Sequence, residues 1–148
     1  MKFVIQRVTE ASVISDGVLT GSIGRGFVVL IGVCDQDDEH IADRFIKKLC
    51  GLRIFEDKNG KTNLSLQDVG GGLLLVSQFT LYANCRKGNR PSFTAAGDPE
   101  HARKIYDYIV SECKKNIPEV GTGIFGADMK VSLVNDGPFT ILLDDDIL

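Results

Sequence analysis

The chain has 148 residues and a mass of 16.1 kDa, which fits one compact domain spanning 1–148, because single cores serve about 100 to 200 residues. Hydrophobic residues at 43% and charged residues at 25% exclude wholesale disorder, and the longest apolar run, Phe27–Cys34, is too short to cross a membrane. A net charge of −3 excludes a polycationic nucleic-acid binder. We therefore expect no DNA or membrane partner, and only local contacts to any RNA.

The first third of the chain reads as four strands: Phe3–Val8, Ser12–Ile14, Val18–Ser22 and Phe27–Val33. Asp16-Gly17 lies between short alternating runs, which is a hairpin signal. Apolar residues then recur at helical spacing from Asp38 to Gly51, which predicts an amphipathic helix.

Leu52–Phe55 returns to extended structure, and Leu73–Val76 is an apolar strand whose polar continuation passes through Phe79–Tyr82. A long loop follows over 84–97, and Asp98-Pro99 opens a second helix that must end before Pro118. Two last strands are predicted over Lys130–Val134 and Phe139–Leu143. Strands grouped around two inserted helices predict an α+β fold rather than a doubly wound sheet.

The cysteines stand at 34, 50, 85 and 113, without a CxxC pair, and the chain has only two histidines, so no metal site is expected. Cys34, Cys50 and Cys113 follow apolar patterns and read as small buried hydrophobes. Free thiols and an N-terminus without a secretion signal predict a cytoplasmic protein.

Neither histidine fits a catalytic triad, because His40 and His101 both fall in the first turn of a predicted helix, where a surface role is expected. The three consecutive aspartates at 144–146 cannot converge on one ion, and they read as a solvated tail.

Two polar clusters remain. Ser77, Gln78 and Thr80 end an apolar strand, and they fit either a reaction site or the solvent face of an ordinary strand. Asn135–Thr140 is a polar turn containing Gly137-Pro138, and X-Pro is the only bond type with an appreciable cis population, about 5 to 6% in folded proteins.

Six motifs, taken together, closely resemble the D-aminoacyl-tRNA deacylase family over essentially the whole chain. They are QRV at Gln6–Val8, RIF at Arg53–Phe55, SQFTL at Ser77–Leu81, RPSF at Arg90–Phe93, ADM at Ala127–Met129 and VSLVNDGP at Val131–Pro138. One residue departs from the family, because Phe139 stands where the family usually has valine in GPVT. The resemblance implies a deacylase-type fold, a mixed, largely antiparallel sheet or open barrel, in a homodimer with its active sites at the subunit interface.

The resemblance also implies a function. The substrate would be the 3′ end of D-aminoacyl-tRNA, and no metal or cofactor is required. A cis Gly137–Pro138 turn from each subunit would enter the other subunit's site and reject L-aminoacyl groups sterically. Glycine lacks a side chain that could clash, so glycyl-tRNA mischarged on tRNA-Ala is an expected second substrate.

The SQFTL segment, Ser77, Gln78, Phe79 and Thr80, would be the catalytic segment, with main-chain N–H groups near Phe79 and Thr80 holding the ester oxygen. Thr80 lacks an obvious base, so a held water assisted by the ribose 2′-hydroxyl is preferred as nucleophile.

Substrate-binding roles fall, by the same resemblance, to Arg7, Phe125 and Met129. Arg7 would pin the incoming turn, or else be a surface charge, and Phe125 and Met129 would pack against the terminal adenosine, or else belong to the core. Arg86, Lys87 and Arg90 form the densest basic loop, which fits either tRNA phosphates or a solvated surface.

Two other functions stay open. One is a noncatalytic dimer that grips the aminoacyl end of tRNA, if Phe139 spoils the site. The other is a conventional Ser/Thr esterase for small esters, against which the missing His base argues.

Overall fold

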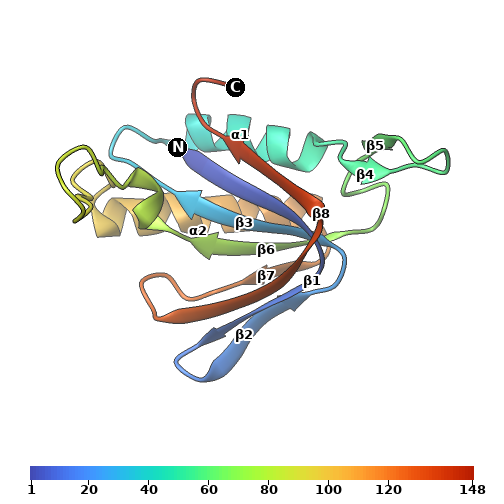
Figure 1. Cartoon of the computed structure of the whole chain (residues 1–148), viewed down its shortest axis with the longest axis horizontal. Coiled ribbons are helices and arrows are strands. Elements are labelled where there is room, and N and C mark those ends of the chain that lie inside the picture. The colour runs from blue at the N-terminus through green and yellow to red at the C-terminus, as the bar shows by residue number, and fades with distance from the viewer.

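A computed structural model describes all residues, 1–148, as one α+β unit (Figure 1). The elements, in chain order, are β1 (Lys2–Ser15), β2 (Val18–Ile23), β3 (Gly26–Gly32), α1 (Glu39–Gly51), β4 (Phe55–Glu56), β5 (Thr62–Leu64), β6 (Gly72–Ser77), the 3₁₀ helix η1 (Phe79–Tyr82), α2 (Pro99–Asn116), β7 (Val120–Thr122) and β8 (Met129–Leu143). No helix is long and apolar enough to span a bilayer.

The main sheet has the order β2-β1-β3-β6-β7, and β8 pairs with β1. β1 is antiparallel to β2, β3 and β8, whereas β3–β6 and β6–β7 are parallel pairs. The two ends of this order come back together, because a Cβ on Gly21 of β2 would lie only 2.7 Å from the Thr122 carbonyl oxygen of β7. The sheet is therefore a nearly closed barrel, and its expected mixed, largely antiparallel character is confirmed.

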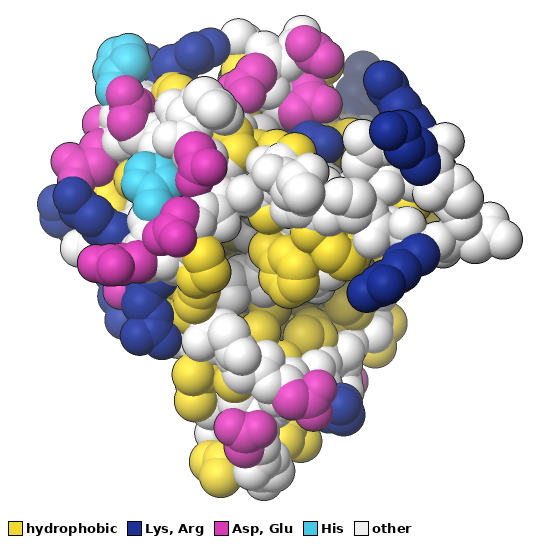
Figure 2. Space-filling model, turned by 90° about the vertical axis from the view of Figure 1, so that its left-hand side faces the viewer, with side chains coloured by type: hydrophobic (Ala, Val, Ile, Leu, Met, Phe, Trp, Pro, Cys, Tyr) yellow, Lys and Arg dark blue, Asp and Glu magenta, His cyan; other side chains and the backbone are white.

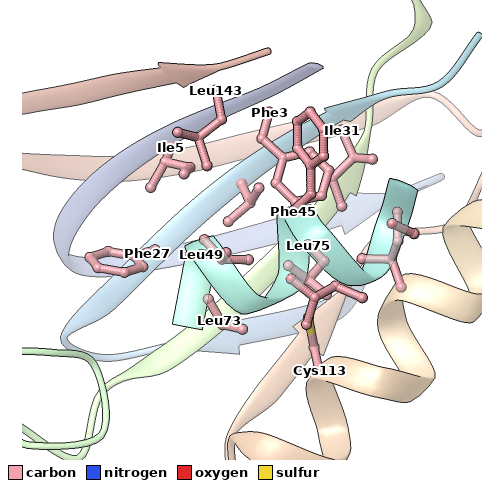
Figure 3. Close-up of a cluster of buried hydrophobic side chains, with 14 of the residues drawn as sticks. Phe3, Ile5, Phe27, Ile31, Phe45, Leu49, Leu73, Leu75, Cys113 and Leu143 are labelled. Carbon is pink, nitrogen blue, oxygen red and sulfur yellow. The ribbon is translucent and has the colours of Figure 1, made fainter. Parts of the chain in front are cut away.

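Both helices form where the apolar spacing predicts them. The Asp38 carboxylate caps α1 by accepting from the Ile41 N–H at 2.8 Å, and Asp98 caps α2 ahead of Pro99. The apolar faces of both helices pack against the sheet around a core that includes Phe3, Phe45, Leu49, Leu75 and Cys113 (Figure 3). A smaller buried cluster fills the barrel on the other face of the sheet, and it consists of Val8, Ala11, Val13, Ile23, Val28, Leu74 and Val76.

Four sequence predictions differ from the structure. The strands expected at Phe3–Val8 and Ser12–Ile14 are one long strand, β1, which continues through a register shift against β8. Likewise β8 runs unbroken through the polar turn, although two strands were expected there. Both errors have one cause: β1 and β8 pair on either side of their polar stretches, so each strand continues past residues 9–10 or 136–139, which lie at the register shifts.

Phe79–Tyr82 is a 3₁₀ helix, not the continuation of a strand. The parallel partner β3 ends at Gly32, so the ladder stops after the Ile31–Ser77 pair. Leu52–Ile54 is not a strand either, and only Phe55–Glu56 pairs, with β5. β5 and β7 were not predicted, because a strand of three residues is too short to show an alternating pattern in the sequence.

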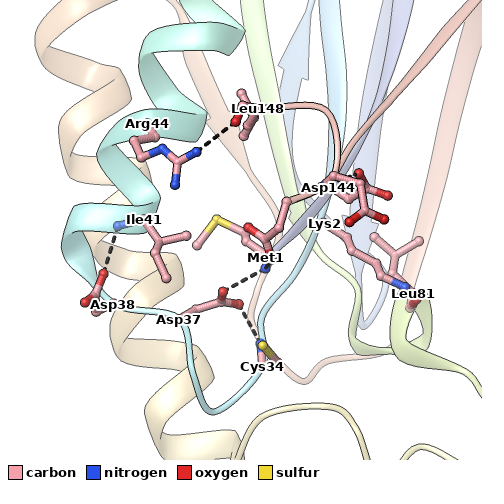
Figure 4. Close-up of polar contacts among 12 residues, drawn as sticks. Met1, Lys2, Cys34, Asp37, Asp38, Ile41, Arg44, Leu81, Asp144 and Leu148 are labelled. Atoms are coloured by element: carbon pink, nitrogen blue, oxygen red, sulfur yellow. Dashed lines mark hydrogen bonds and ion pairs between the residues drawn. The ribbon is translucent and has the colours of Figure 1, made fainter.

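The N-terminus is buried beside the start of α1 (Figure 4). The Met1 ammonium donates to Asp37 Oδ1 at 2.7 Å and to Asp145 Oδ2 at 3.2 Å. The acidic tail is therefore not wholly solvated as expected, because Asp145 contacts the Met1 ammonium. Of the three cysteines predicted to be buried, only Cys113 is fully buried, because Cys34 and Cys50 are half-buried. Cys85, for which burial was not predicted, is exposed.

Candidate active site

A cavity of about 300 Å³ opens at one end of the barrel, and Figure 2 shows it as an apolar hollow. β3 and β6 end there, η1 and the first half of α2 form further walls, and the connection from β7 to β8 covers the remaining side. The lining residues are Ile31, Val33, Val76, Ser77, Gln78, Phe79, Ala102, Tyr106, Phe125, Gly126, Ala127, Asp128, Met129 and Val131. Five of the predicted site residues, Ser77, Gln78, Phe79, Phe125 and Met129, are thus brought to one cavity by segments far apart in the sequence.

The turn from β6 into η1 supplies the polar part of the wall. The Gln78 N–H donates to the Ile31 carbonyl at 2.7 Å, which fixes the chain at the point where it leaves the sheet. The Leu81 N–H then donates to the Gln78 carbonyl at 3.3 Å as the first bond of the helical turn. The N–H groups of Phe79 and Thr80 precede this bond, so they have no partner inside η1.

The Thr80 side chain is exposed, and Thr80 does not line the cavity. Its hydroxyl oxygen accepts from Gln78 Nε2 at 2.5 Å. An amide N–H cannot take a proton from a nucleophile, so this partner does not activate the hydroxyl. The Ser77 hydroxyl, which does line the cavity, makes no hydrogen bond to a protein group.

Neither histidine reaches this turn. His40 is exposed at the start of α1, and His101 contacts the Asp37 carbonyl oxygen through Nε2 at 2.9 Å. His101 is partly buried by this contact rather than freely exposed as expected. A serine or threonine triad is therefore not assembled in this chain. The structure also brings no group of three or more His, Cys, Asp or Glu side chains together at a spacing that holds a metal ion.

Phe125 and Met129 form the wall opposite η1. The Phe125 ring packs against Tyr106 of α2, with 5.9 Å between ring centroids, and the Arg103 guanidinium lies 5.5 Å from the centroid on the exposed side. Gly123 leaves the space that the Met129 side chain occupies, because a Cβ on Gly123 would overlap the Met129 sulfur. Both side chains line the cavity and also pack against the hydrophobic clusters, so their packing is confirmed and their contact with adenosine stays a prediction.

Tyr106 is a wall residue that sequence reasoning placed only on the apolar face of a helix. Its hydroxyl donates to the Leu75 carbonyl at 2.8 Å, and burial raises the pKa of the phenol. The only sequence signal for this position was a tyrosine among aliphatic residues, which marks a buried side chain that needs a polar partner.

Arg7 is buried, with 8% of its surface accessible, so the surface-charge interpretation is wrong. Its guanidinium donates to the Ile54 carbonyl at 2.6 Å and to the Asp136 carbonyl at 3.0 Å, and it lies 4.7 Å from the centroid of the Phe139 ring. Arg7 contacts the turn of its own chain, and its expected contact with an incoming turn stays a prediction.

The Gly137–Pro138 bond is cis, as the resemblance implied. Both residues are exposed, and neither lines the cavity. The Asn135 side chain shapes the turn, since its Oδ1 accepts from the Phe139 N–H at 2.7 Å and its Nδ2 donates to Gln6 Oε1 at 2.7 Å. Within one chain, the turn and the cavity are therefore separate features.

Comparison with known proteins decides the family. A model of the family described as D-Tyr-tRNA(Tyr) deacylase matches residues 4–144. The chain belongs to the D-Tyr-tRNA(Tyr) deacylase family. Relatives named D-aminoacyl-tRNA deacylase include one from Pelobacter propionicus, 54% identical over 97% of this chain and 99% of its own, and one from Stutzerimonas stutzeri, 51% identical over the same shares.

Solved structures share the deacylase fold. A structure described as c-Myc DNA Unwinding Element Binding Protein is 40% identical, has a TM-score of 0.92 and covers 98% of this chain and 99% of its own. A second, described as a probable eukaryotic D-amino acid tRNA deacylase, has a TM-score of 0.83 over 96% of this chain and 97% of its own. That second protein is 17% identical, so it supports the fold alone.

Proposed function

We propose that this chain hydrolyses the ester bond of D-aminoacyl-tRNA, releasing free tRNA and the D-amino acid, at the cavity between η1 and the β7–β8 connection. One observation carries the proposal: in a member of this family, Ser77, Gln78 and Phe79 of the predicted reaction segment line the same cavity as the two predicted adenosine-binding residues. Aminoacyl-tRNA serves translation, so we place the reaction in the cytoplasm.

The catalytic part of the proposal uses the main chain. The Phe79 and Thr80 N–H groups lack helical partners, and they are available to the ester carbonyl oxygen as negative charge develops on it. Donors of this kind contribute about 3 to 4 kcal/mol each to transition-state stabilisation. A water held at this turn attacks the carbonyl carbon, the ribose 2′-hydroxyl of the substrate assists, and the ester oxygen leaves with a proton. Because Thr80 has only an amide partner, Thr80→Ala is expected to retain substantial hydrolysis.

Chiral selection is assigned to Gly137 and Pro138 of a second copy of the chain. The turn is exposed and does not line the cavity of its own chain, which supports its insertion into the cavity of a second copy. A rigid backbone wall at the α-carbon of the substrate would exclude an L side chain by steric overlap, while a D side chain points away. Glycine has no side chain to exclude, so glycyl-tRNA mischarged on tRNA-Ala is proposed as a second substrate.

The first experiment measures deacylation of D-tyrosyl-tRNA and L-tyrosyl-tRNA at equal concentration. The unaltered protein is expected to deacylate only the D-ester, and a Gly137→Ala/Pro138→Ala variant is expected to lose the distinction. Lys58→Ala/Asn59→Ala, which changes two exposed residues in the β4–β5 turn, serves as the matched control. If the unaltered protein hydrolyses neither ester, the result favours the noncatalytic tRNA-binding dimer instead.

A mixing experiment tests the cross-subunit arrangement. The turn variant is co-expressed with a Phe125→Ala/Met129→Ala variant, and the mixed dimer is purified through two different tags. If the turn serves the partner's cavity, one site of the mixed dimer has both an intact cavity and an intact turn, so D-selective hydrolysis returns to about half of the unaltered rate. If the turn serves its own cavity, the mixed dimer has no intact site and selectivity does not return.

A further inference from the structure

A basic loop stands beside the cavity and is unused by the function above. The segment 84–97, here called the basic loop, contains Arg86, Lys87 and Arg90 and no acidic residue, in a chain whose net charge is −3. All three cations are exposed. None of their side chains takes part in an ion pair or a hydrogen bond, since the ion pairs of the chain involve only Met1, Arg7, Lys115 and Lys130 as cations.

The basic loop is attached to the cavity wall at both ends. It follows η1 directly, and the Phe93 ring packs edge-on against the Phe79 ring that lines the cavity, with 5.2 Å between centroids. At its far end the Gly97 N–H donates to the carbonyl of Val33, another lining residue, at 2.9 Å.

The loop is also closed on itself. Asn84 and Ser92 form a two-way backbone bridge, with N–O distances of 2.7 and 2.9 Å, so the three cations lie within one hairpin-like excursion. Their charge is therefore held near the cavity mouth instead of being spread over the surface.

Charge is distributed unevenly around the cavity. In Figure 2 the side of the apolar hollow that holds the two histidines carries acidic and basic side chains together, whereas Lys and Arg side chains stand on the opposite side. On α2 and at its cap, Asp98, Glu100 and Asp107 share the surface with Arg103 and Lys104. The α2 side therefore carries charges of both signs, whereas the basic loop carries positive charge alone and is the side that attracts a polyanion.

We infer that the basic loop binds the backbone phosphates of the RNA strand next to the 3′-terminal adenosine of the substrate tRNA. Unpaired Arg and Lys side chains suit phosphate oxygens, because each contact releases condensed counterions and needs no particular base. The inference rests on the proposed function, since it takes the terminal adenosine to lie in the cavity. The basic loop would then be a positioning surface. Substrate binding would depend on the length of the RNA, although the ester bond that breaks lies at the 3′ end of that RNA.

The test compares two substrates that share the esterified adenosine, of which one carries the rest of the tRNA with its phosphates. D-tyrosyl-tRNA carries the whole acceptor strand, whereas the 3′-D-tyrosyl ester of adenosine carries no phosphate. For Arg86→Ala/Lys87→Ala/Arg90→Ala, we expect the KM for D-tyrosyl-tRNA to rise about tenfold or more at unchanged kcat, and hydrolysis of the adenosine ester to stay within about twofold. Intact turnover of the adenosine ester also shows that the variant folds.

The control variant Lys47→Ala/Lys58→Ala/Lys61→Ala removes the same charge from exposed positions on α1 and in the β4–β5 hairpin, and this hairpin lies at the opposite end of the molecule from the basic loop in Figure 1. Its KM for D-tyrosyl-tRNA is expected to change by less than about twofold. An equal rise in KM in both triple variants would mean that overall charge, rather than the basic loop, attracts the RNA, and this would overturn the inference.

Binding of uncharged tRNA, followed by fluorescence anisotropy, tests the inference without the chemistry. Each lost phosphate contact lowers the slope of log Kd against log salt by roughly 0.7 to 0.9, so the triple variant should lose about 2 to 3 from that slope. An unchanged slope overturns the inference even if deacylation is confirmed. If the unaltered protein hydrolyses no ester but the triple variant changes the slope of log Kd against log salt, the proposed reaction is rejected and the basic loop remains a phosphate-binding surface.

A single-stranded DNA of the acceptor-strand sequence completes the binding experiment, because a relative that is 40% identical is named for binding a DNA element. We expect the DNA to bind more weakly than tRNA. If the DNA binds more tightly and loses its affinity in the same triple variant, the loop is a DNA-binding surface and the assignment to tRNA is wrong.

Discussion

Replacing Arg7 by methionine removes a buried cation that holds three separate segments together. The guanidinium donates to the carbonyl of Ile54 before β4 and to the carbonyl of Asp136 in the turn, and it faces the Phe139 ring. Methionine keeps most of the side-chain volume but has no donor. Both carbonyl oxygens would then lose a charge-assisted partner, and the turn would be attached to β1 through Asn135 and the β1–β8 pairing alone.

The size of this effect follows from those contacts. A hydrogen bond to a charged group is worth about 1.5 to 3 kcal/mol, and a partly buried cation–π contact adds about 0.5 to 2 kcal/mol. The ion pair with Asp136, at 3.8 Å and half exposed, adds little. Desolvation of the guanidinium offsets part of this sum, so we expect Arg7→Met to lower the free energy of unfolding by about 3 to 5 kcal/mol. Arg7→Lys, which can satisfy only one carbonyl, should lose about half as much.

Urea unfolding at a fixed protein concentration measures these differences, with the concentration held constant because the proposed dimer would contribute to stability. The ratio of D-tyrosyl-tRNA to L-tyrosyl-tRNA deacylation is measured on the same samples. We expect selectivity to fall together with stability, since the turn proposed to select the substrate is the segment that loses its contact with Arg7. A loss of less than 1 kcal/mol in Arg7→Met would show that the Arg7 contacts do not hold the turn.

The remaining predictions concern the N-terminus, the cavity wall and the turn. Burial alone would lower the pKa of the Met1 ammonium, but hydrogen bonds and charge attraction from Asp37 and Asp145 outweigh it and raise that pKa above 8.0. The folded state therefore binds this proton more tightly than the unfolded state. The stabilisation is complete below pH 8 and is lost as the pH rises through the raised pKa of the Met1 ammonium. The urea midpoint should fall over that pH window, and it should fall less in Asp37→Asn. Gly123→Ala places a methyl group against the Met129 sulfur, so Met129 must move, and the KM for D-tyrosyl-tRNA should change severalfold with little loss of stability; an unchanged KM would separate Met129 from substrate binding. Phe139→Val removes the ring that faces Arg7 and should cost about 1 to 2 kcal/mol in urea unfolding without loss of D-selectivity, whereas improved selectivity would show that Phe139 distorts the turn.

Much of the local structure follows from local patterns. Both helices, their Asp caps and the Asp16-Gly17 hairpin turn could be read from the sequence, because apolar spacing, capping and turn chemistry act within a few residues. The candidate site was reached through motif resemblance, which pointed to Ser77, Gln78 and Phe79 without giving a reason for their proximity to Phe125 and Met129. Tyr106 carried no motif, so it was missed as a wall of the cavity.

The tertiary structure decided what no local pattern contains. Because β1 and β8 pair over most of their length, the four predicted strands in these regions are two continuous strands. Because β3 ends at Gly32, Phe79–Tyr82 has no strand to pair with and forms a 3₁₀ helix. Arg7 illustrates the difference best: in the sequence it is one charge in a strand, and only the approach of Ile54 and Phe139 from distant segments buries it. The sequence by itself determined which stretches form helices and where the polar turns fall, because those choices depend on neighbours in the chain. The tertiary structure alone decided which polar groups meet, because those distances depend on how the barrel nearly closes.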